Sequence, residues 1–304
     1  MLLYTHPACL AHDPGTGHPE SPARLRAVLE TLDEPRFAAI ERVEATRATR
    51  TQLERVHDTA LIEQVFASAP QIGYAQLDAD TSMSPDSLEA ALRAAGAVCA
   101  AVDALIDGDD TRAFCAVRPP GHHATRDTAM GFCLFNNIAV GAAQALARGI
   151  ERVAIVDFDV HHGNGTQDIF WNDPRVLYAS THQSPLYPGT GARDETGAGN
   201  IVNAPLPPGA GSAQFRAVMS GIVLPRLVEF RPQLVMISAG FDAHRLDPLA
   251  SLNFDAEDFA WVTRELVAVS KAQAQGRVVS SLEGGYSLTA LRESTAACVA
   301  ALLE

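Results

Sequence analysis

Four side chains that can bind a metal lie close together in the stretch DFDVHHGNGTQ: Asp157, Asp159, His161 and His162. Residues two apart in an extended segment project to the same side, so Asp159 and His161 can bind one ion. The adjacent His162 is expected to order the loop instead. Aspartate and histidine without thiolates favour a divalent metal. Asp242, in SAGFDAH, can supply a third ligand, and three protein ligands with an open position are typical of a catalytic site.

The remaining polar groups suit metal-assisted hydrolysis. The adjacent His122 and His123 of RPPGHHA offer a base for an attacking water if a partner fixes each tautomer, and Asp157 and Asn164 flank the metal ligands. Tyr286, after the glycines of EGGYSL, can donate to a developing oxyanion. The sequence contains no GxSxG nucleophile motif, P-loop or dinucleotide fingerprint. These features predict a hydrolase of a neutral carbonyl bond.

These side chains need a framework that brings distant loops together. Short apolar runs predict strands at 113–117, 153–158, 176–180, 234–238 and 277–282. Between and after them, helical patterns cover 85–106, 135–148, 212–230, 256–275 and 288–303. This alternation predicts an α/β protein with a parallel sheet covered by helices on both faces, built as a single domain over residues 1–304. The chemistry-bearing stretches follow four of the strands, so they should meet at the carboxyl edge of the sheet.

Composition limits the classes of partner. The 304-residue chain is 47% hydrophobic and has a formal net charge of −13 with scattered basic residues, which predicts no nucleic-acid surface. The five cysteines share no CxxC spacing and are expected to be free thiols. No run is long enough for a membrane span, and the N-terminus lacks the pattern of an export signal. We therefore expect a cytoplasmic protein.

Five motifs, in order and spacing, resemble the histone deacetylase superfamily: RPPGHHA, GFCLFNN, DFDVHHGNGTQ, SAGFDAH and EGGYSL. The resemblance runs from HPESPARL at residue 18 to the last helix, and it is strongest to class II members and their bacterial relatives, including acetylpolyamine amidohydrolases. It implies the arginase/deacetylase fold and one Zn²⁺ bound by Asp159, His161 and Asp242. It pairs His122 with Asp157 and His123 with Asn164, makes His123 the proton shuttle, and makes Tyr286 the group that polarises the substrate carbonyl. Gly163 and Gly165 are expected to turn the chain tightly so that Asn164 reaches His123.

The resemblance also implies K⁺ ions and a substrate tunnel. Asp157 and Ser180 match an inner K⁺ site, and an outer site aligns with Phe170, Asp173 and Val176. Gly131 and Phe132 match one wall of an acyl-lysine tunnel, and Tyr187 stands where the opposite wall is expected. Leu249 occupies the position that an acidic gatekeeper residue has in deacetylases that prefer polyamines. Arg24 matches an arginine of an internal cavity behind the metal. His12, His18 and His57 are expected to have no direct role, His244 and Asp247 to lie around the site, and Met83 and Met130 to pack.

Several interpretations stay open at this point. The preferred substrate is an acyl-lysine side chain of a protein or peptide, because Leu249 is apolar, and an acylated polyamine is the alternative. An arginase-like ureohydrolase with two manganese ions would need more bridging carboxylates than the histidine-rich motif supplies. A third alternative is a binding module that has kept the pocket without catalysis. Recognition of the substrate is assigned to loops at the rim of the site, such as DADTSMSPDS. The sequence does not determine the acyl group or the oligomeric state.

Overall fold

The computed structural model describes residues 1–304 and is built on one parallel sheet of eight strands in the order β2-β1-β5-β10-β9-β6-β7-β8. The strands are β1 Leu2–Thr5, β2 Glu41–Glu44, β5 Arg112–Cys115, β6 Val153–Asp157, β7 Val176–Gln183, β8 Ile201–Leu206, β9 Leu234–Ala239 and β10 Val278–Leu282. Every residue of β6, β9 and β10 is buried. Strands buried on both faces read as continuous apolar runs, which is why the sequence predicted them.

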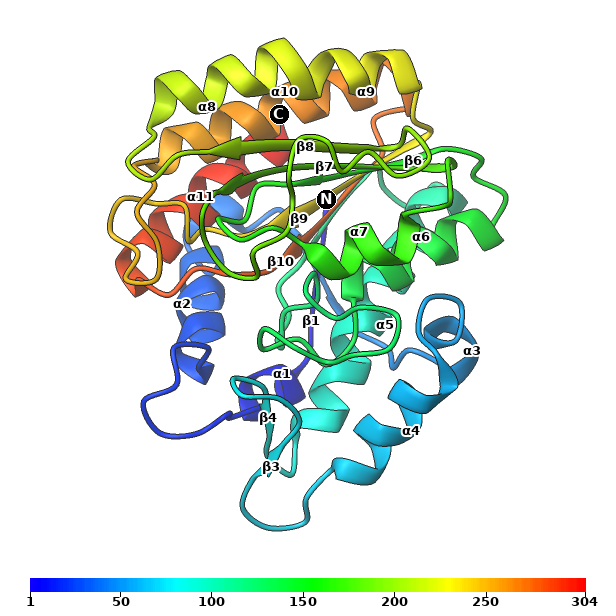
Figure 1. The fold of residues 1–304 in the computed structure, drawn as a ribbon, viewed down its shortest axis with the longest axis vertical. Coiled ribbons are helices and arrows are strands. Elements are labelled where there is room, and N and C mark those ends of the chain that lie inside the picture. Colours follow the sequence, from blue (N-terminus) through cyan, green and yellow to red (C-terminus); the bar gives the residue numbers. More distant parts are fainter.

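Helices cover both faces of this sheet (Figure 1). Helices α5 (Ser87–Asp107) and α6 (Asn137–Ala147) pack together on one face, while α10 (Ala256–Gln273) and α11 (Leu288–Leu303) pack together on the other. The buried apolar side chains form one continuous cluster. The predicted α/β architecture, with a parallel sheet between two helical layers, is confirmed, and no helix is long and apolar enough to cross a membrane.

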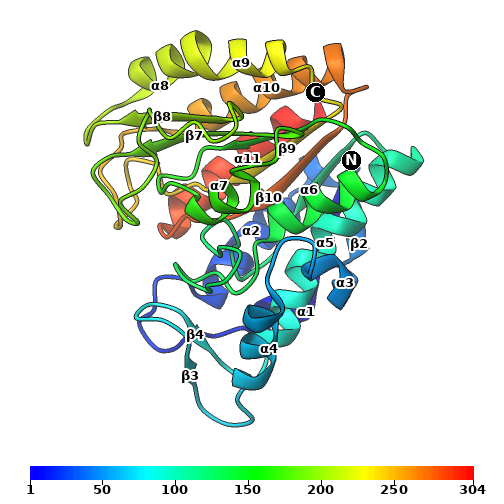
Figure 2. The same cartoon turned by 45° about the vertical axis from the view of Figure 1, so that its right-hand side comes forward.

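Smaller elements surround this framework. The short helices are α1 Pro7–Ala11, α2 Pro22–Leu32, α3 Arg50–Leu53, α4 Thr59–Ser68, α7 Asn164–Phe170, α8 Ser212–Val218 and α9 Leu224–Phe230. Strands β3 (Ala75–Gln76) and β4 (Ser82–Met83) form a small antiparallel hairpin. Figure 2 shows the hairpin, α1 and α4 at the end of the molecule opposite α8 and α9.

The helical segment predicted over 212–230 has these bounds, but its winding is not uniform. Helices α8 and α9 are separated by a π-helical turn at Met219–Val223. Pro225, near the start of α9, has no N–H to continue the preceding hydrogen-bond ladder, so the backbone changes its winding there.

Three strands of the large sheet were not predicted, and each lies at or beside an edge. Strand β2 is largely exposed along its length and so carries no apolar signal, and β1 is apolar but only four residues long at the start of the chain. Strand β8 contains Asn203 and Pro205, and a proline is tolerated there because β8 is the edge strand.

Candidate active site

The candidate metal ligands, the histidine pair and Tyr286 come from loops at the carboxyl ends of four neighbouring strands, β5, β10, β9 and β6. The loop after β5 carries the histidine pair, β6 runs into Asp159 and His161, the loop after β9 carries Asp242, and the loop after β10 carries Tyr286. Strands remote in the sequence are adjacent in the sheet, so its topology brings these side chains to one place.

A group of three potential metal ligands lies at the centre of these loops. The ligand atoms of Asp159, His161 and Asp242 lie within 4.8 Å of one another. His161 Nδ1 is 3.1 Å from Asp159 Oδ1 and 3.2 Å from Asp242 Oδ2. Asp242 Oδ2 is nevertheless buried without a hydrogen-bond partner. A buried carboxylate oxygen normally has such a partner. This oxygen is therefore suited to bind a cation.

Backbone amides hold the two carboxylates in place. Gly284 N–H donates to Asp159 Oδ2 at 2.8 Å, and Val160 N–H donates to Asp242 Oδ1 at 2.9 Å. Burial and then the negative charge of Asp159 raise the pKa of Asp242 to about 7. A divalent cation would offset this repulsion between carboxylates, so the donor set fits such an ion.

Glycines make room for the carboxylates. A Cβ on Gly240 would lie 2.0 Å from Asp159 Oδ2, and a Cβ on Gly284 would lie 2.1 Å from Asp242 Oδ2. Both loops therefore require glycine for close approach to the candidate metal centre.

Two adjacent histidines face different partners. His122 Nδ1 lies 3.0 Å from Asp157 Oδ2, and His123 Nδ1 lies 2.8 Å from Asn164 Oδ1. Both acceptors are oxygens, so each neutral ring carries its proton on Nδ1 and leaves Nε2 free. The ring centroids are 4.0 Å apart.

The two histidines have opposite pKa shifts. Burial lowers the pKa of His122, but the carboxylates of Asp157 and Asp159 more than offset it and raise the pKa to about 10. Burial and then the positive charge of His122 hold the pKa of His123 well below its usual range. The pair therefore combines a histidine that keeps a positive charge with one that stays neutral and can accept a proton.

Asp157 has a second partner that the sequence analysis missed. The Tyr178 hydroxyl donates to Asp157 Oδ2 at 3.0 Å and accepts from Gly163 N–H at 3.0 Å. Tyr178 lies two residues before Ser180 in β7, so both face the same side, and that spacing was available as a signal. Ser180 is the register partner of Asp157 on β7, and its hydroxyl lies 2.9 Å from His182 Nδ1.

The histidine pair and His161 line a pocket of about 210 Å³. All four residues predicted to contact substrate line it: Gly131, Phe132, Tyr187 and Leu249. Tyr286 also lines it, with its ring centroid 6.0 Å from that of Phe132. The structure therefore brings the candidate metal ligand His161, the histidine pair and the tyrosine to the end of one pocket.

Asp80, Pro120 and Leu186 line the same pocket but were not singled out from the sequence. Asp80 Oδ1 accepts from Gly131 N–H at 3.1 Å, and Thr81 Oγ1 accepts from Phe132 N–H at 3.0 Å. The loop DADTSMSPDS, expected at the rim, thus also fixes the backbone of the pocket wall.

Arg24 supports the loop that carries Tyr286. Its buried guanidinium donates to Gly285 O at 2.6 Å, to Glu283 O at 2.5 Å and to Glu20 Oε1 at 2.8 Å. Its Cζ lies 4.8 Å from the centroid of the Tyr286 ring. Glu20 is also buried and forms an ion pair with a second arginine, Arg118. Neither Glu20 nor Arg118 was identified from the sequence.

The other histidines and Asp247 do not line the pocket. His57 bridges Thr125 O and Asn136 N–H, His12 lies between Ser87 and Glu20, and the His18 ring packs on Phe132 with centroids 4.6 Å apart. His162 contacts Thr190 and Gln167 and so joins a loop to α7. His244 Nδ1 accepts from Leu246 N–H. Asp247 Oδ2 accepts from Tyr286 N–H at 2.7 Å, which helps to place the tyrosine.

The two methionines differ in their contacts. Met83 is buried, but Met130 Sδ contacts Asn164 Nδ2, so Met130 does more than pack.

An α/β sheet with a candidate metal centre, a histidine pair and a tyrosine at its carboxyl edge defines a metallohydrolase-like protein. A family model described as "Histone deacetylase domain" matches residues 18–302. The chain therefore belongs to the histone deacetylase family, a family of hydrolases.

Named relatives agree with this membership. A "Probable deacetylase" of Archaeoglobus fulgidus is 41% identical over 93% of this chain and 80% of its own length. A "Histone deacetylase-like amidohydrolase" of Pseudomonas aeruginosa is 41% identical over 89% of this chain and 73% of its own. The crystal structure of the HDA15 HD domain matches with a TM-score of 0.94 and 36% identity, covering 100% of this chain and 88% of that one.

Proposed function

We propose that this protein is a zinc-dependent amidohydrolase that removes acyl groups, acetyl first of all, from N-acylated amines. The observation that carries the proposal is that Asp159, His161 and Asp242 lie together as candidate metal ligands. One of them, His161, lines a pocket with His123 and Tyr286. The names of the relatives support the same reaction class.

The chain's residues divide the reaction between them. When bound to Asp159, His161 and Asp242, Zn²⁺ would supply Lewis-acid polarisation of the acyl carbonyl and a lowered pKa for an attacking water. His123, held neutral and with Nε2 free, accepts the proton of that water and returns it to the leaving amine. His122 lies beside it, with Nδ1 held by Asp157.

Tyr286 completes this arrangement as the donor to the carbonyl oxygen. Burial raises the pKa of its hydroxyl well above the usual value, so the hydroxyl keeps its proton and can donate a hydrogen bond. The carboxylate of Asp247 and the guanidinium of Arg24 hold its backbone and ring in place.

We test the proposal with Tyr286→Phe. Removal of the hydroxyl should lower kcat on an acetyl-lysine peptide by about 10²–10³-fold, because one oxyanion donor contributes that much. The thermal unfolding midpoint should stay close to that of the wild type. Tyr187→Phe is the matched control, since Tyr187 lines the same pocket but is 39% exposed at its mouth. Equal turnover in wild type and Tyr286→Phe would remove Tyr286 from the mechanism.

Acyl-lysine of a protein or peptide is the proposed substrate because the rim residue Leu249 is apolar and 37% exposed. One observation supports acylated polyamines as a second candidate. Asp80 places a carboxylate at the pocket, and only its Oδ1 accepts hydrogen bonds within the chain. Its Oδ2 is therefore available to an ammonium group, which binds a carboxylate more strongly than a neutral N–H does.

The two substrates are separated by measuring kcat/KM on an acetyl-lysine peptide and on an N-acetylated polyamine, with zinc stripped and restored. We expect the peptide to be preferred and zinc to restore activity on both. Leu249→Glu should shift the ratio toward the polyamine by adding a second carboxylate at the rim. A strong polyamine preference of the wild type would reverse our assignment, and two manganese ions per chain would favour the ureohydrolase.

A bound K⁺ beside Asp157 is part of the proposal. Asp157 and Ser180 are register partners on β6 and β7, and both side chains are fully buried. A monovalent cation there would offset the buried negative charge of Asp157, which His122 and Tyr178 also share.

A further inference from the structure

Three carbonyl oxygens converge where the family resemblance aligns an outer K⁺ site. They belong to Phe170 at the end of α7, Asp173 in the following turn, and Val176 at the start of β7. All three accept from a single nitrogen, Asn200 Nδ2, at 2.8, 3.1 and 2.8 Å respectively. We call these three carbonyls the outer cradle.

The orientation of the Asn200 side chain is fixed from its other end. Its Oδ1 accepts from Ala198 N–H at 3.0 Å, and its backbone carbonyl accepts from Tyr178 N–H at 3.0 Å. The residue is only 3% exposed. With the amide oxygen already used, the NH₂ group necessarily faces the carbonyls, which can only accept.

The outer cradle has little capacity left for an ion. Phe170 O also accepts from Asp173 N–H at 3.1 Å, and Asp173 O also accepts from Val176 N–H at 3.1 Å. Each carbonyl oxygen has two lone pairs, so both acceptors are already fully used. The hydrogens on Asn200 Nδ2 carry partial positive charge at the place where a cation would sit.

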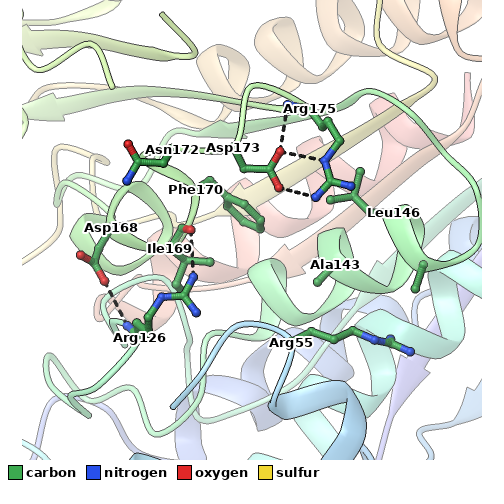
Figure 3. A pocket seen from close by; sticks show the side chains of 11 residues that line it. Arg55, Arg126, Ala143, Leu146, Asp168, Ile169, Phe170, Asn172, Asp173 and Arg175 are labelled. Atoms are coloured by element: carbon green, nitrogen blue, oxygen red, sulfur yellow. Dashed lines mark hydrogen bonds and ion pairs between the residues drawn. The ribbon is translucent and has the colours of Figure 1, made fainter. Parts of the chain in front are cut away.

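The carboxylate of Asp173 is held by another partner, not by the outer cradle. Figure 3 shows the Asp173 side chain paired with Arg175, at 2.7 and 2.9 Å, on the wall of a surface pocket of about 730 Å³. A cation in the outer cradle would therefore find only neutral carbonyls, and an arginine close by.

We infer that the side-chain amide of Asn200 takes the place of the outer monovalent cation in this protein. The turn between α7 and β7 is consequently closed by the chain itself, and any alkali-ion dependence arises elsewhere. This inference goes beyond the proposed function, and its test does not depend on deacylase activity.

The direct test is a crystal structure of the wild type with Tl⁺ in place of K⁺, because thallium gives an anomalous signal. We expect no thallium peak within coordination distance of the carbonyl oxygens of Phe170, Asp173 and Val176. A peak bound to these three oxygens would overturn the inference.

A second test uses Asn200→Ala, which empties the outer cradle. Asn172→Ala is the matched control, since Asn172 lies in the same turn and is exposed, and the side-chain donor to the outer cradle is Asn200 instead. Melting temperatures are compared in choline chloride and in KCl. We expect Asn200→Ala to melt lower than wild type in choline chloride and to regain part of this loss in KCl, beyond any K⁺ effect in Asn172→Ala. A loss that K⁺ does not reduce would contradict the equivalence of amide and cation.

Discussion

At the scale of single residues, the environment decides what chemically identical side chains do. His122 and His123 are neighbours in the sequence, yet a carboxylate faces one and an amide oxygen faces the other. Burial lowers the pKa of His122, but Asp157 and Asp159 outweigh burial and raise that pKa. Burial and the charge of His122 lower the pKa of His123. Pairs of titratable groups whose pKa values are driven apart by their surroundings are typical of acid-base sites.

His57 is a buried histidine outside the pocket, and it predicts a pH dependence of stability. Its Nδ1–H donates to Thr125 O and its Nε2 accepts from Asn136 N–H, so a second proton on the ring would meet a donor. Burial lowers its pKa from 6.5 to about 4. Between these values the unfolded chain binds more protons than the folded chain, so the contribution of His57 is intact above pH 6.5 and is lost as the pH falls toward 4.

We therefore expect the free energy of unfolding of His57→Gln to fall less steeply with acid than that of the wild type. The difference should accumulate to about 3 kcal/mol between pH 7 and 4, at about 1.4 kcal/mol per pKa unit. Urea unfolding at a series of pH values measures it. Parallel curves for the two proteins would show that His57 does not titrate in this way.

At the scale of elements, glycines matter here for close approach. Gly163 and Gly165 were expected to give a tight turn, but neither has a positive φ. A Cβ on Gly163 would instead lie 2.4 Å from Asp157 Oδ2, and a Cβ on Gly165 would lie 2.2 Å from Ala124 O. The start of α7 therefore lies directly against the histidine loop, which lets Asn164 reach His123.

The loop after β10 gives a prediction of the same kind. In Gly284→Ala the new methyl group would lie 2.1 Å from Asp242 Oδ2, so the carboxylate must move. We expect zinc affinity to fall at least tenfold and stability to fall by about 1–3 kcal/mol, as for overpacked sites. Competition with a chelating dye measures the affinity.

Gly221→Ala is the control for Gly284→Ala. No atom lies within 4 Å of the position that a methyl group on Gly221 would take, and this glycine lies in the helical segment between α8 and α9. The substitution should be neutral or slightly stabilising, since alanine favours helix. Unchanged zinc affinity in Gly284→Ala would contradict the placement of the metal beside this loop.

At the scale of the whole molecule, folding concentrates negative charge around the candidate metal centre. Asp157, Asp159, Asp242 and Glu283 are all at most 1% exposed. Such burial is costly unless cations and hydrogen bonds offset it. The metal is therefore expected to stabilise the fold as well as to serve the reaction.

Removal of the metal should thus lower the melting temperature, and Zn²⁺ should restore it. At a free zinc concentration of about 1,000 times Kd, the gain is about 4 kcal/mol. Differential scanning calorimetry of chelated and reconstituted protein measures it. Asp242→Ala lacks one ligand and should lose most of the zinc-dependent gain; an equal gain in both proteins would place the stabilising metal elsewhere.

The formal net charge of −13 gives a prediction about substrate encounter. An acetylated polyamine carries positive charge and is attracted by this field, whereas a blocked acetyl-lysine amide is neutral. We expect kcat/KM for the polyamine to fall with ionic strength and that for the neutral substrate to stay nearly constant. Equal salt dependence would mean that the field of the protein does not guide the substrate.

The sequence by itself determined the α/β class, five of the sheet strands and the polar stretches that follow four of them, because buried strands and metal-binding side chains leave local patterns. The pairing of the short edge strands depended on contacts that no local pattern records. The π-helical turn before α9 and the orientation of Tyr178 do have local signals, Pro225 and the spacing to Ser180, but the contacts they lead to appear only in the folded chain. Asp80 and Asn200 show the same limit most clearly. The contacts that decide the role of each residue are with groups that lie far away in the sequence. Only the tertiary structure therefore decided that Asp80 lines the pocket and that the Asn200 amide donates to three carbonyls.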